Sequence, residues 1–397
     1  MNKRIIALVL CLCVLSVPVM TTRAYGLEIT PANETAFDLP CKAAILIDED
    51  SGTVLYEKKA DEQRPIASIT KVMTLLLAFE ALEAGKVKLT DVVPVSEHAY
   101  GMGGSQIWLE PGEQLTLNDM FKAICICSAN DAAVAVSEFI GGSEPAFVEQ
   151  MNARAAALGM SNTHFKNACG LDEAGHISTA RDVATMSREV LLNHTEVEDY
   201  CMIWMDSLRD GATQLINTNK MLKSYSGITG LKTGTTGGAG VCISASATRG
   251  DLRLIAVVLG ANSGKERFAA ATTLLDYGFA NYENAEVKLP ENMPELLPAT
   301  HAMEDTVTLA YTSPEKYLMP KGQGSTLTAE LELPESLAAP LEAGAQVGTV
   351  HILDNGTKIA DYPVTVSTAV TERTFGICFR RLVDALKLHP TDFVQIG

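Results

Sequence analysis

Two pairs of short apolar runs predict β-hairpins in separate parts of the chain. Residues 43–48 and 53–56 are rich in alanine, isoleucine, leucine and valine, and a polar Asp-Ser-Gly turn separates them. Residues 241–248 and 252–259 repeat this arrangement around the turn Arg249-Gly250-Asp251. Apolar, β-branched runs interrupted by turn residues are typical of paired strands. Because helical patterns lie between the two hairpins, we expect one sheet assembled from distant segments.

Apolar residues spaced three and four apart predict the helices. A helix is expected over residues 68–84, after Pro65, and another over residues 265–281. Residues 116–194 are alanine-rich with helical spacing and few strand signals, which predicts a helical lobe. The side chains expected to face the core in the first and last of these segments are Leu75, Leu76, Phe79 and Leu82, and Phe268, Leu274, Leu275 and Phe279.

The pattern changes near residue 289, where prolines punctuate short alternating runs such as residues 306–309 and 346–350. Alternation bounded by prolines and turn residues predicts short strands. A chain of 397 residues is long enough for two domains. We therefore expect a first domain over residues 25–285 and a small β-rich domain over 286–370 that carries no catalytic constellation.

The tail over residues 371–397 contains a basic amphipathic pattern. Residues 374–388 place five apolar side chains at helical spacing, and four basic residues surround them. Such a helix lies on an anionic membrane surface or packs on the preceding β-domain, and the pattern alone leaves both open. The apolar residues are Phe375, Phe379, Leu382, Val383 and Leu386, and the basic residues are Arg373, Arg380, Arg381 and Lys387.

The N-terminus has the composition of a signal peptide. Lys3 and Arg4 precede an apolar run over residues 5–20, and Thr22-Arg23-Ala24 follows as a cleavage site. A retained membrane anchor is the alternative, but the run is short for a membrane span and Pro18 interrupts it. We expect residues 1–24 to direct export and to be removed.

Charge, cysteine and histidine content exclude several classes of protein. The formal charge of −17 argues against nucleic acid as a partner, because a phosphate backbone requires basic patches. Seven cysteines follow the signal segment, an odd number at irregular spacing that does not form a disulfide framework. The seven histidines match no metal-ligand pattern, so we expect neither a metal nor another cofactor.

The principal candidate for chemistry is Ser68, followed three positions later by Lys71 at the start of an apolar helical run. Residues three apart share a helix face, so the hydroxyl and the amine would meet. A neutral lysine can take the proton of a serine nucleophile, and the free N–H groups of a first helical turn can hold an oxyanion. A lone Ser-x-x-Lys is a weak signal, but Ser128-Ala129-Asn130 and Lys232-Thr233-Gly234 follow it in the order of the β-lactamases and penicillin-binding proteins.

These three motifs resemble those of the low-molecular-mass penicillin-binding proteins, and within that group the serine D-alanyl-D-alanine carboxypeptidases (peptidase family S11). Three further stretches carry the similarity: Gly170-Leu171-Asp172, residues 178–182 and residues 227–231. The resemblance implies an α/β fold of the β-lactamase and transpeptidase type, a sandwich with a helical lobe, followed by the β-rich domain. It also implies peptidoglycan stem peptides as substrate, β-lactam antibiotics as inhibitors, and a location on the outer face of the cytoplasmic membrane.

The resemblance and the residue types together assign roles. Ser68 would attack, Lys71 would be its base, and Ser128 would pass a proton to the departing amine. Lys232 would repel a second positive charge and so help to keep one amine of the pair neutral. Asn130 would hold Lys71 or the substrate amide, and Thr235 would offer a second oxyanion N–H on an edge strand to which the substrate adds, with Gly234 allowing a close backbone approach. The residues expected to bind the substrate carboxylate are Lys232, Thr233 and Arg267, although Arg267 could equally be an exposed helical arginine.

Two rival functions remain open at this point. Residues 189–193 match the Glu-x-x-Leu-Asn pattern with which class A β-lactamases activate a deacylating water, so a β-lactamase or esterase on the same scaffold is one alternative. The position of Glu189 at the end of a helix, far beyond Ser128, instead predicts a solvated helix residue. A catalytically silent wall-binding protein is the second alternative, and the intact set of motifs opposes it.

Overall fold

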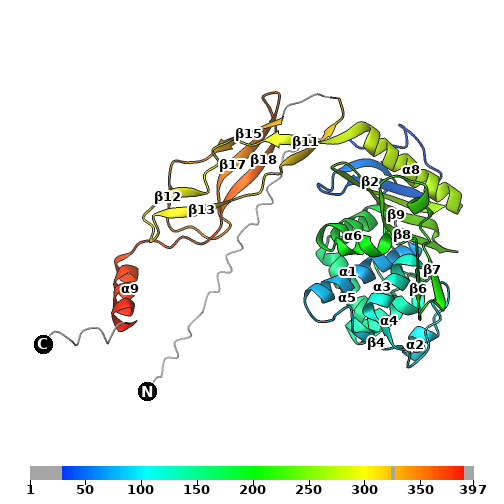
Figure 1. The fold of residues 1–397 in the computed structure, drawn as a ribbon. Helices are drawn as coiled ribbons and strands as arrows, with labels where there is room; N and C mark the ends of the chain where they lie inside the picture. The colour runs from blue at the N-terminus through cyan, green and yellow to red at the C-terminus, as the bar shows by residue number, and fades with distance from the viewer. Residues whose placement is uncertain (1–28, 323–326, 389–397) are drawn as a thin grey trace, which may run out of the picture. The chain divides into compact units, whose positions relative to one another are not determined.

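The computed structural model describes residues 29–322 and 327–388, so the predicted signal segment over residues 1–24 lies outside the described residues. From residue 29 onward the chain divides into two compact units. Among the described residues, 29–285 and 316–322 form the first unit, and 286–315 and 327–388 form the second. Figure 1 shows the helices α1 to α6 and α8 gathered with the first sheet in one unit, and the strands β12, β13, β15, β17 and β18 in the other.

The first unit is built on a six-stranded sheet in the order β1-β3-β2-β10-β9-β8. Both hairpins predicted from the apolar runs are confirmed, and β10 pairs antiparallel with β2, so that Val257 lies opposite Ile45. The strand that follows the helical lobe, β8, is at the free edge of the sheet and pairs with β9 alone. The strands are β1 Ala32–Asn33, β2 Ala43–Asp48, β3 Val54–Lys58, β8 Ile228–Thr236, β9 Gly240–Arg249 and β10 Leu252–Ala261.

Two apolar cores cover the two faces of this sheet, because successive side chains of a strand point to opposite faces. Ile45 and Ile47 belong to the core shared with the helical lobe, whereas Ala44 and Leu46 belong to the core beneath helix α8. The helices are α1 Lys71–Glu83, α2 Glu97–Tyr100, α3 Leu117–Ile126, α4 Asn130–Gly141, α5 Glu144–Ala157, α6 Ala180–Asn193, α7 Glu196–Cys201 and α8 Gly264–Asn281. Two small ribbons accompany them, β4 Val92–Val93 with β5 Leu115–Thr116, and β6 Met205–Leu208 with β7 Thr213–Ile216.

The helix predicted from Ser68 begins differently. Residues Ala67–Thr70 form a 3₁₀ turn, and the α-helix starts at Lys71. The backbone of Ala67 explains this start, because its φ of 50° cannot be accommodated in an α-helix. Two side chains assigned to the core are only partly buried: Leu82, which packs at the rim of the larger core, and Phe268, whose ring lies 4.4 Å from the guanidinium of Arg267.

The second unit is a β-sheet in which β15, β17 and β18 form an antiparallel meander, followed by β13, β12 and β16. The predicted strands at residues 306–309 and 346–350 are confirmed within β13 and β17. The strands after α8 are β11 Tyr282–Lys288, β12 Leu296–Thr300, β13 Thr306–Tyr311, β14 Lys316–Pro320, β15 Leu327–Glu332, β16 Leu337–Ala338, β17 Gln346–Asp354 and β18 Thr357–Val366. The strand β14 belongs to the first unit, where Leu318 joins the core beneath α8, and β11 begins in the same unit with Tyr282 in that core.

The predicted amphipathic helix is present as α9, Phe375–Leu388. Its apolar residues Phe375, Phe379 and Leu382 are 86%, 56% and 58% exposed, and the two phenylalanine rings stack with centroids 6.0 Å apart. None of the helices in the described part of the chain is long and apolar enough to cross a bilayer. The helix therefore presents apolar side chains to solvent instead of burying them in the described structure.

Candidate active site

Ser68 lies in a turn that its surroundings hold tightly. Gly170 packs against the carbonyl of Ala67, and a Cβ atom at this glycine would lie 2.0 Å from that oxygen. Gly234 of β8 packs against the same turn, and a Cβ atom there would lie 2.9 Å from the Ser68 nitrogen. The hydroxyl of Thr70 donates to the Ala67 carbonyl at 2.9 Å. The close approach expected at Gly234 is thus made by the chain's own serine turn.

Lys71 is completely buried and directly contacts the serine. Its Nζ lies 3.0 Å from Ser68 Oγ, 2.6 Å from Asn130 Oδ1 and 2.6 Å from the Cys169 carbonyl oxygen. Burial disfavours the charged amine and lowers the pKa of Lys71 to about 8. A lysine in this state exchanges protons near neutral pH, and its two oxygen acceptors keep the amine pointed at the hydroxyl.

A second lysine and a second serine repeat this arrangement. Lys232 Nζ donates to Ser128 Oγ at 2.8 Å and to its neighbouring Thr233 carbonyl at 2.9 Å. Burial, and after it the positive charge of Lys71, lowers the pKa of Lys232 to about 7. Ser128 has a φ of 64°, which is uncommon for a residue with a Cβ atom. Each buried amine therefore contacts one hydroxyl: Lys71 contacts Ser68, and Lys232 contacts Ser128.

The edge strand β8 carries the remaining predicted site residues. Thr233 is buried and its hydroxyl donates to Thr218 Oγ1 at 2.7 Å, whereas Thr235 is exposed. Arg267 is only 8% exposed, so the alternative of an exposed helical arginine is wrong. Its Nη1 donates to the carbonyls of Cys242 at 3.2 Å and Gly234 at 3.4 Å, which places a buried positive charge beneath the strand. Burial lowers the pKa of Arg267 to about 10.

Several residues at the site were not identified from the sequence. His176 Nδ1 accepts from the Lys166 N–H, so its Nε2 carries the proton that Thr70 Oγ1 accepts at 2.8 Å. The Asp172 carboxylate accepts from Thr236 Oγ1 at 2.6 Å and from the Gly238 N–H at 2.9 Å. This bridge ties the loop that carries Gly170 to the glycine-rich turn after β8. The pattern Gly-Leu-Asp was visible in the sequence, but the partners of Asp172 were not.

Glu189 is held in an ion pair. Arg154 Nη2 lies 2.6 Å from Glu189 Oε1, and Arg154 Nε lies 2.6 Å from Glu80 Oε1. The Glu189 side chain is only 23% exposed, so the expectation of a solvated residue is wrong. Arg154 of α5 thus joins Glu189 of α6 to Glu80 of α1, and Glu189 is engaged in a structural contact.

The thiols and the histidines contribute no further centre in the described part of the chain. The six cysteines there other than Cys378 are buried or half-buried, and no cysteine among residues 29–322 and 327–388 forms a disulfide. Within the same residues no group of three or more histidine, cysteine, aspartate or glutamate side chains could hold a metal ion.

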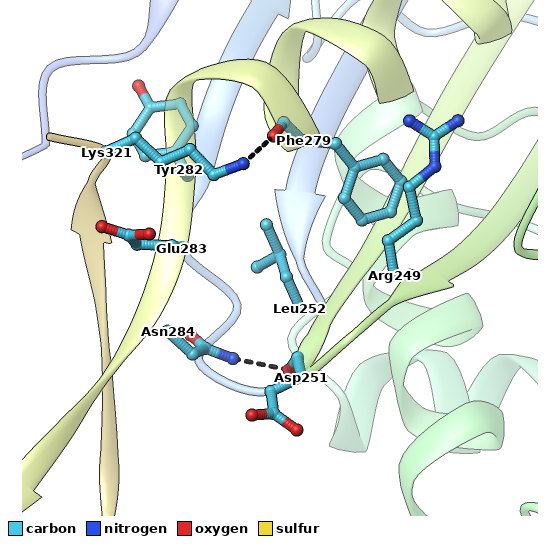
Figure 2. A pocket seen from close by; sticks show the side chains of 8 residues that line it. All are labelled: Arg249, Asp251, Leu252, Phe279, Tyr282, Glu283, Asn284 and Lys321. Carbon is cyan, nitrogen blue, oxygen red and sulfur yellow. Dashed lines mark hydrogen bonds between the residues drawn. The ribbon is translucent and has the colours of Figure 1, made fainter.

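A separate pocket opens where α8 ends (Figure 2). The guanidinium of Arg249 lies 4.5 Å from the ring of Tyr225 and 4.6 Å from that of Phe279. Lys321 Nζ donates to the Phe279 carbonyl at 2.6 Å, and Asn284 Nδ2 donates to the Asp251 carbonyl at 2.8 Å. These contacts tie chain segments together, and the pocket holds none of the serines or lysines above. Its lining residues are Arg249, Asp251, Leu252, Phe279, Tyr282, Glu283, Asn284 and Lys321.

Comparisons with known proteins place this geometry in a family. Residues 30–263 match the family model of D-alanyl-D-alanine carboxypeptidase, and residues 294–372 match that of the C-terminal domain of penicillin-binding protein 5. The D-alanyl-D-alanine carboxypeptidase DacF of Bacillus subtilis is 41% identical over 344 residues, covering 86% of this chain and 88% of that protein.

Solved structures agree with the sequence comparison. The crystal structure of penicillin-binding protein 5 from Haemophilus influenzae superimposes with a TM-score of 0.73 at 31% identity, covering 84% of this chain and 98% of that one. Penicillin-binding protein D2 of Listeria monocytogenes, solved with cefotaxime bound, has a TM-score of 0.57 at 33% identity over 61% of this chain and 98% of that one. The predicted fold, a transpeptidase-type α/β domain followed by a β-rich domain, is therefore confirmed, and the chain belongs to the family of serine D-alanyl-D-alanine carboxypeptidases, the penicillin-binding peptidases of family S11.

Proposed function

We propose that this carboxypeptidase removes the terminal D-alanine of peptidoglycan stem pentapeptides through an acyl-enzyme on Ser68. The observation that carries the assignment of the nucleophile is the 3.0 Å contact between Ser68 Oγ and the completely buried Lys71 Nζ. A serine becomes a nucleophile when a positioned base takes its proton, and a desolvated lysine is such a base.

The roles of the other groups follow from their positions. The neutral amine of Lys71 takes the proton of Ser68 Oγ as this oxygen bonds to the carbonyl carbon of the penultimate D-alanine. The N–H groups of Ser68 and Thr235 hold the oxyanion, because both lie where the serine turn meets the edge strand. Ser128, backed by Lys232, passes a proton to the nitrogen of the departing D-alanine. A water then splits the ester and restores Ser68.

Substrate binding uses the free edge of β8. An extended peptide adds to an exposed strand through main-chain hydrogen bonds, and β8 has a partner on one side only. The terminal carboxylate meets the hydroxyls of Thr233 and Thr235, and the buried charge of Arg267 beneath Gly234 stabilises it. Asn130 holds Lys71 through its Oδ1, so its contribution to substrate binding is secondary.

Benzylpenicillin distinguishes this function from its rivals. We expect brief exposure to give a penicilloyl adduct on Ser68 that persists, because Glu189 is engaged with Arg154, and Asp172 with Thr236 and Gly238, so that neither carboxylate is free to activate a deacylating water. Intact-protein and peptide mass spectrometry over time is the measurement, with Ser68→Ala as the control that should carry no adduct. An adduct that disappears as penicillin is consumed would indicate a β-lactamase, and the absence of any adduct would indicate a silent wall-binding protein.

We further propose that the protein is exported and associates with the outer face of the cytoplasmic membrane through α9. The exposed rings of Phe375 and Phe379 beside Arg380 and Arg381 support this, since an amphipathic helix with basic residues binds anionic lipid. The purified protein should sediment with phosphatidylglycerol vesicles but not with phosphatidylcholine vesicles. The double variant Phe375→Ser with Phe379→Ser should remain in the supernatant, whereas Leu296→Ser, at an exposed leucine of β12, should sediment normally. Equal sedimentation of the double variant and the original protein would contradict the proposal.

A further inference from the structure

Trp108 is the most exposed large apolar side chain of the first unit among the described residues. It is 76% exposed, although tryptophan is usually buried to a large extent in folded domains. A single exposed aromatic residue is not unusual by itself. The backbone of Trp108, however, has a φ of 59°, a left-handed conformation that costs free energy for any residue with a Cβ atom.

Two charged side chains hold this strained backbone in place. The carboxylate of Asp131, only 1% exposed, accepts from the N–H groups on both sides of Trp108, those of Ile107 and Leu109, each at 3.1 Å. From the ribbon of β6 and β7, Arg209 donates to the carbonyl of Ile107 at 2.8 Å and to that of Trp108 at 3.3 Å. The strain is thus maintained by its surroundings, as is common where a side chain has a functional position.

The same loop borders the catalytic groups. The Asn130 N–H donates to the Ser105 carbonyl at 2.7 Å, and Asn130 Nδ2 donates to the Gly103 carbonyl at 2.7 Å. Asn130 Oδ1 in turn accepts from Lys71. Residues 103–109 therefore form one segment that contacts Asn130, the partner of Lys71, at its start and carries the exposed indole of Trp108 near its end.

We infer that Trp108 is a substrate-binding residue that contacts the part of the peptidoglycan substrate beyond the D-alanyl-D-alanine end, namely the inner stem peptide and its attached amino sugar. A rigid indole offers a large apolar face at little cost in conformational entropy, and the C–H face of a sugar ring or an aliphatic peptide stem packs against such a surface. Binding energy from a remote part of a substrate supports reaction at the scissile bond. The inference rests on the proposed function and deepens it by naming a determinant of substrate size.

The test compares two substrates with one enzyme. The values of kcat/KM are measured for release of D-alanine from diacetyl-L-lysyl-D-alanyl-D-alanine and from a disaccharide pentapeptide. In Trp108→Ala, the ratio of kcat/KM for the larger to that for the smaller substrate should fall about 10-fold. Trp108→Phe, which keeps an aromatic face, should retain most of the ratio. Tyr100→Ala, at an aromatic residue that is 52% exposed, is the matched control and should leave the ratio unchanged.

A second readout uses the tryptophans directly. The chain has two, and the other is Trp204, whose ring lies 4.3 Å from Lys223 Nζ. In the Ser68→Ala background, the disaccharide pentapeptide should change the tryptophan fluorescence, and Trp108→Phe should abolish that change. A ratio unaltered in Trp108→Ala would overturn the inference while leaving the carboxypeptidase intact. If the original enzyme hydrolysed neither substrate, the proposed function would fail, and the inference with it.

Discussion

Replacing Lys71 by methionine is expected to lower the rate at which benzylpenicillin acylates Ser68 by about 10³-fold, within the range typical of losing a general base. Methionine fills a similar volume but cannot take the proton of the hydroxyl 3.0 Å away. The measurement is the second-order acylation rate constant. Lys86→Met, at an exposed lysine just beyond the C-terminal end of the same helix α1, is the control and should acylate normally.

The rate at which benzylpenicillin acylates Ser68 is expected to depend on pH. Lys71 must be neutral to act as a base, and its pKa is lowered to about 8, so the acylation rate should rise with pH up to and through that value. The pKa of Lys232 is also lowered, to about 7, and the two amines interact. The pH profile of the acylation rate therefore reports apparent pKa values of the pair. The stability of the folded protein should also rise with pH. A lysine whose pKa is lower in the folded than in the unfolded protein destabilises the fold at low pH, and this destabilisation is relieved as the pH rises from about 7 toward 10.5.

Thermal unfolding of the Lys71→Met variant is measured separately, so that a loss of activity can be distinguished from a loss of folding. Methionine removes a buried amine and also leaves the acceptors Asn130 Oδ1 and Cys169 O without their donor, so its effect on thermal unfolding is a balance of opposing contributions. A Lys71→Met variant that unfolds cooperatively yet acylates at the original rate would show that another group is the base, and Lys232 would then be the first candidate.

The sequence predicted the parts of the site that are local or ordered along the chain. Ser68 and Lys71 are three residues apart, so one turn brings them together whatever the rest of the fold. The presence of Ser128 and Lys232 at the site followed from the order of the motifs and the family resemblance, but their direct contact across 104 positions was not predicted. The hairpins and α8 followed from apolar periodicity because each has a face buried in one of the two cores.

The features that were not predicted depend on contacts between distant segments, which leave no periodic pattern in the sequence. The bridge from Asp172 to Thr236 and Gly238 joins two loops, and loop partners are fixed by the fold around them, not by spacing. The sequence left open whether Arg267 is buried or exposed, because its guanidinium is buried only by the packing of α8 on β9 and β8. The 3₁₀ start at Ala67 was missed for the same reason, since Ala67 packs against Gly170 and Gly234, which come from distant segments.

Gly170→Ala is expected to nearly abolish acylation, by 10²-fold or more at roughly the scale of a misplaced catalytic group. The added Cβ atom would lie 2.0 Å from the Ala67 carbonyl oxygen and 2.4 Å from its carbon, so the loop or the serine turn must move. Moving the loop also shifts the Cys169 carbonyl, which accepts from Lys71, and thereby disturbs nucleophile and base together.

The same loop provides the control. Gly175 has a φ of 84°, almost equal to the 86° of Gly170, but a Cβ atom there would meet only the end of the Lys166 side chain at 3.5 Å. Both alanine variants therefore carry a left-handed penalty of about 1–2 kcal/mol, and only Gly170→Ala adds the collision with the serine turn. Acylation by benzylpenicillin and thermal unfolding are measured for both. If Gly175→Ala lost as much acylation as Gly170→Ala, backbone strain alone would explain the effect, and the contact between Gly170 and Ala67 could not be what positions Ser68.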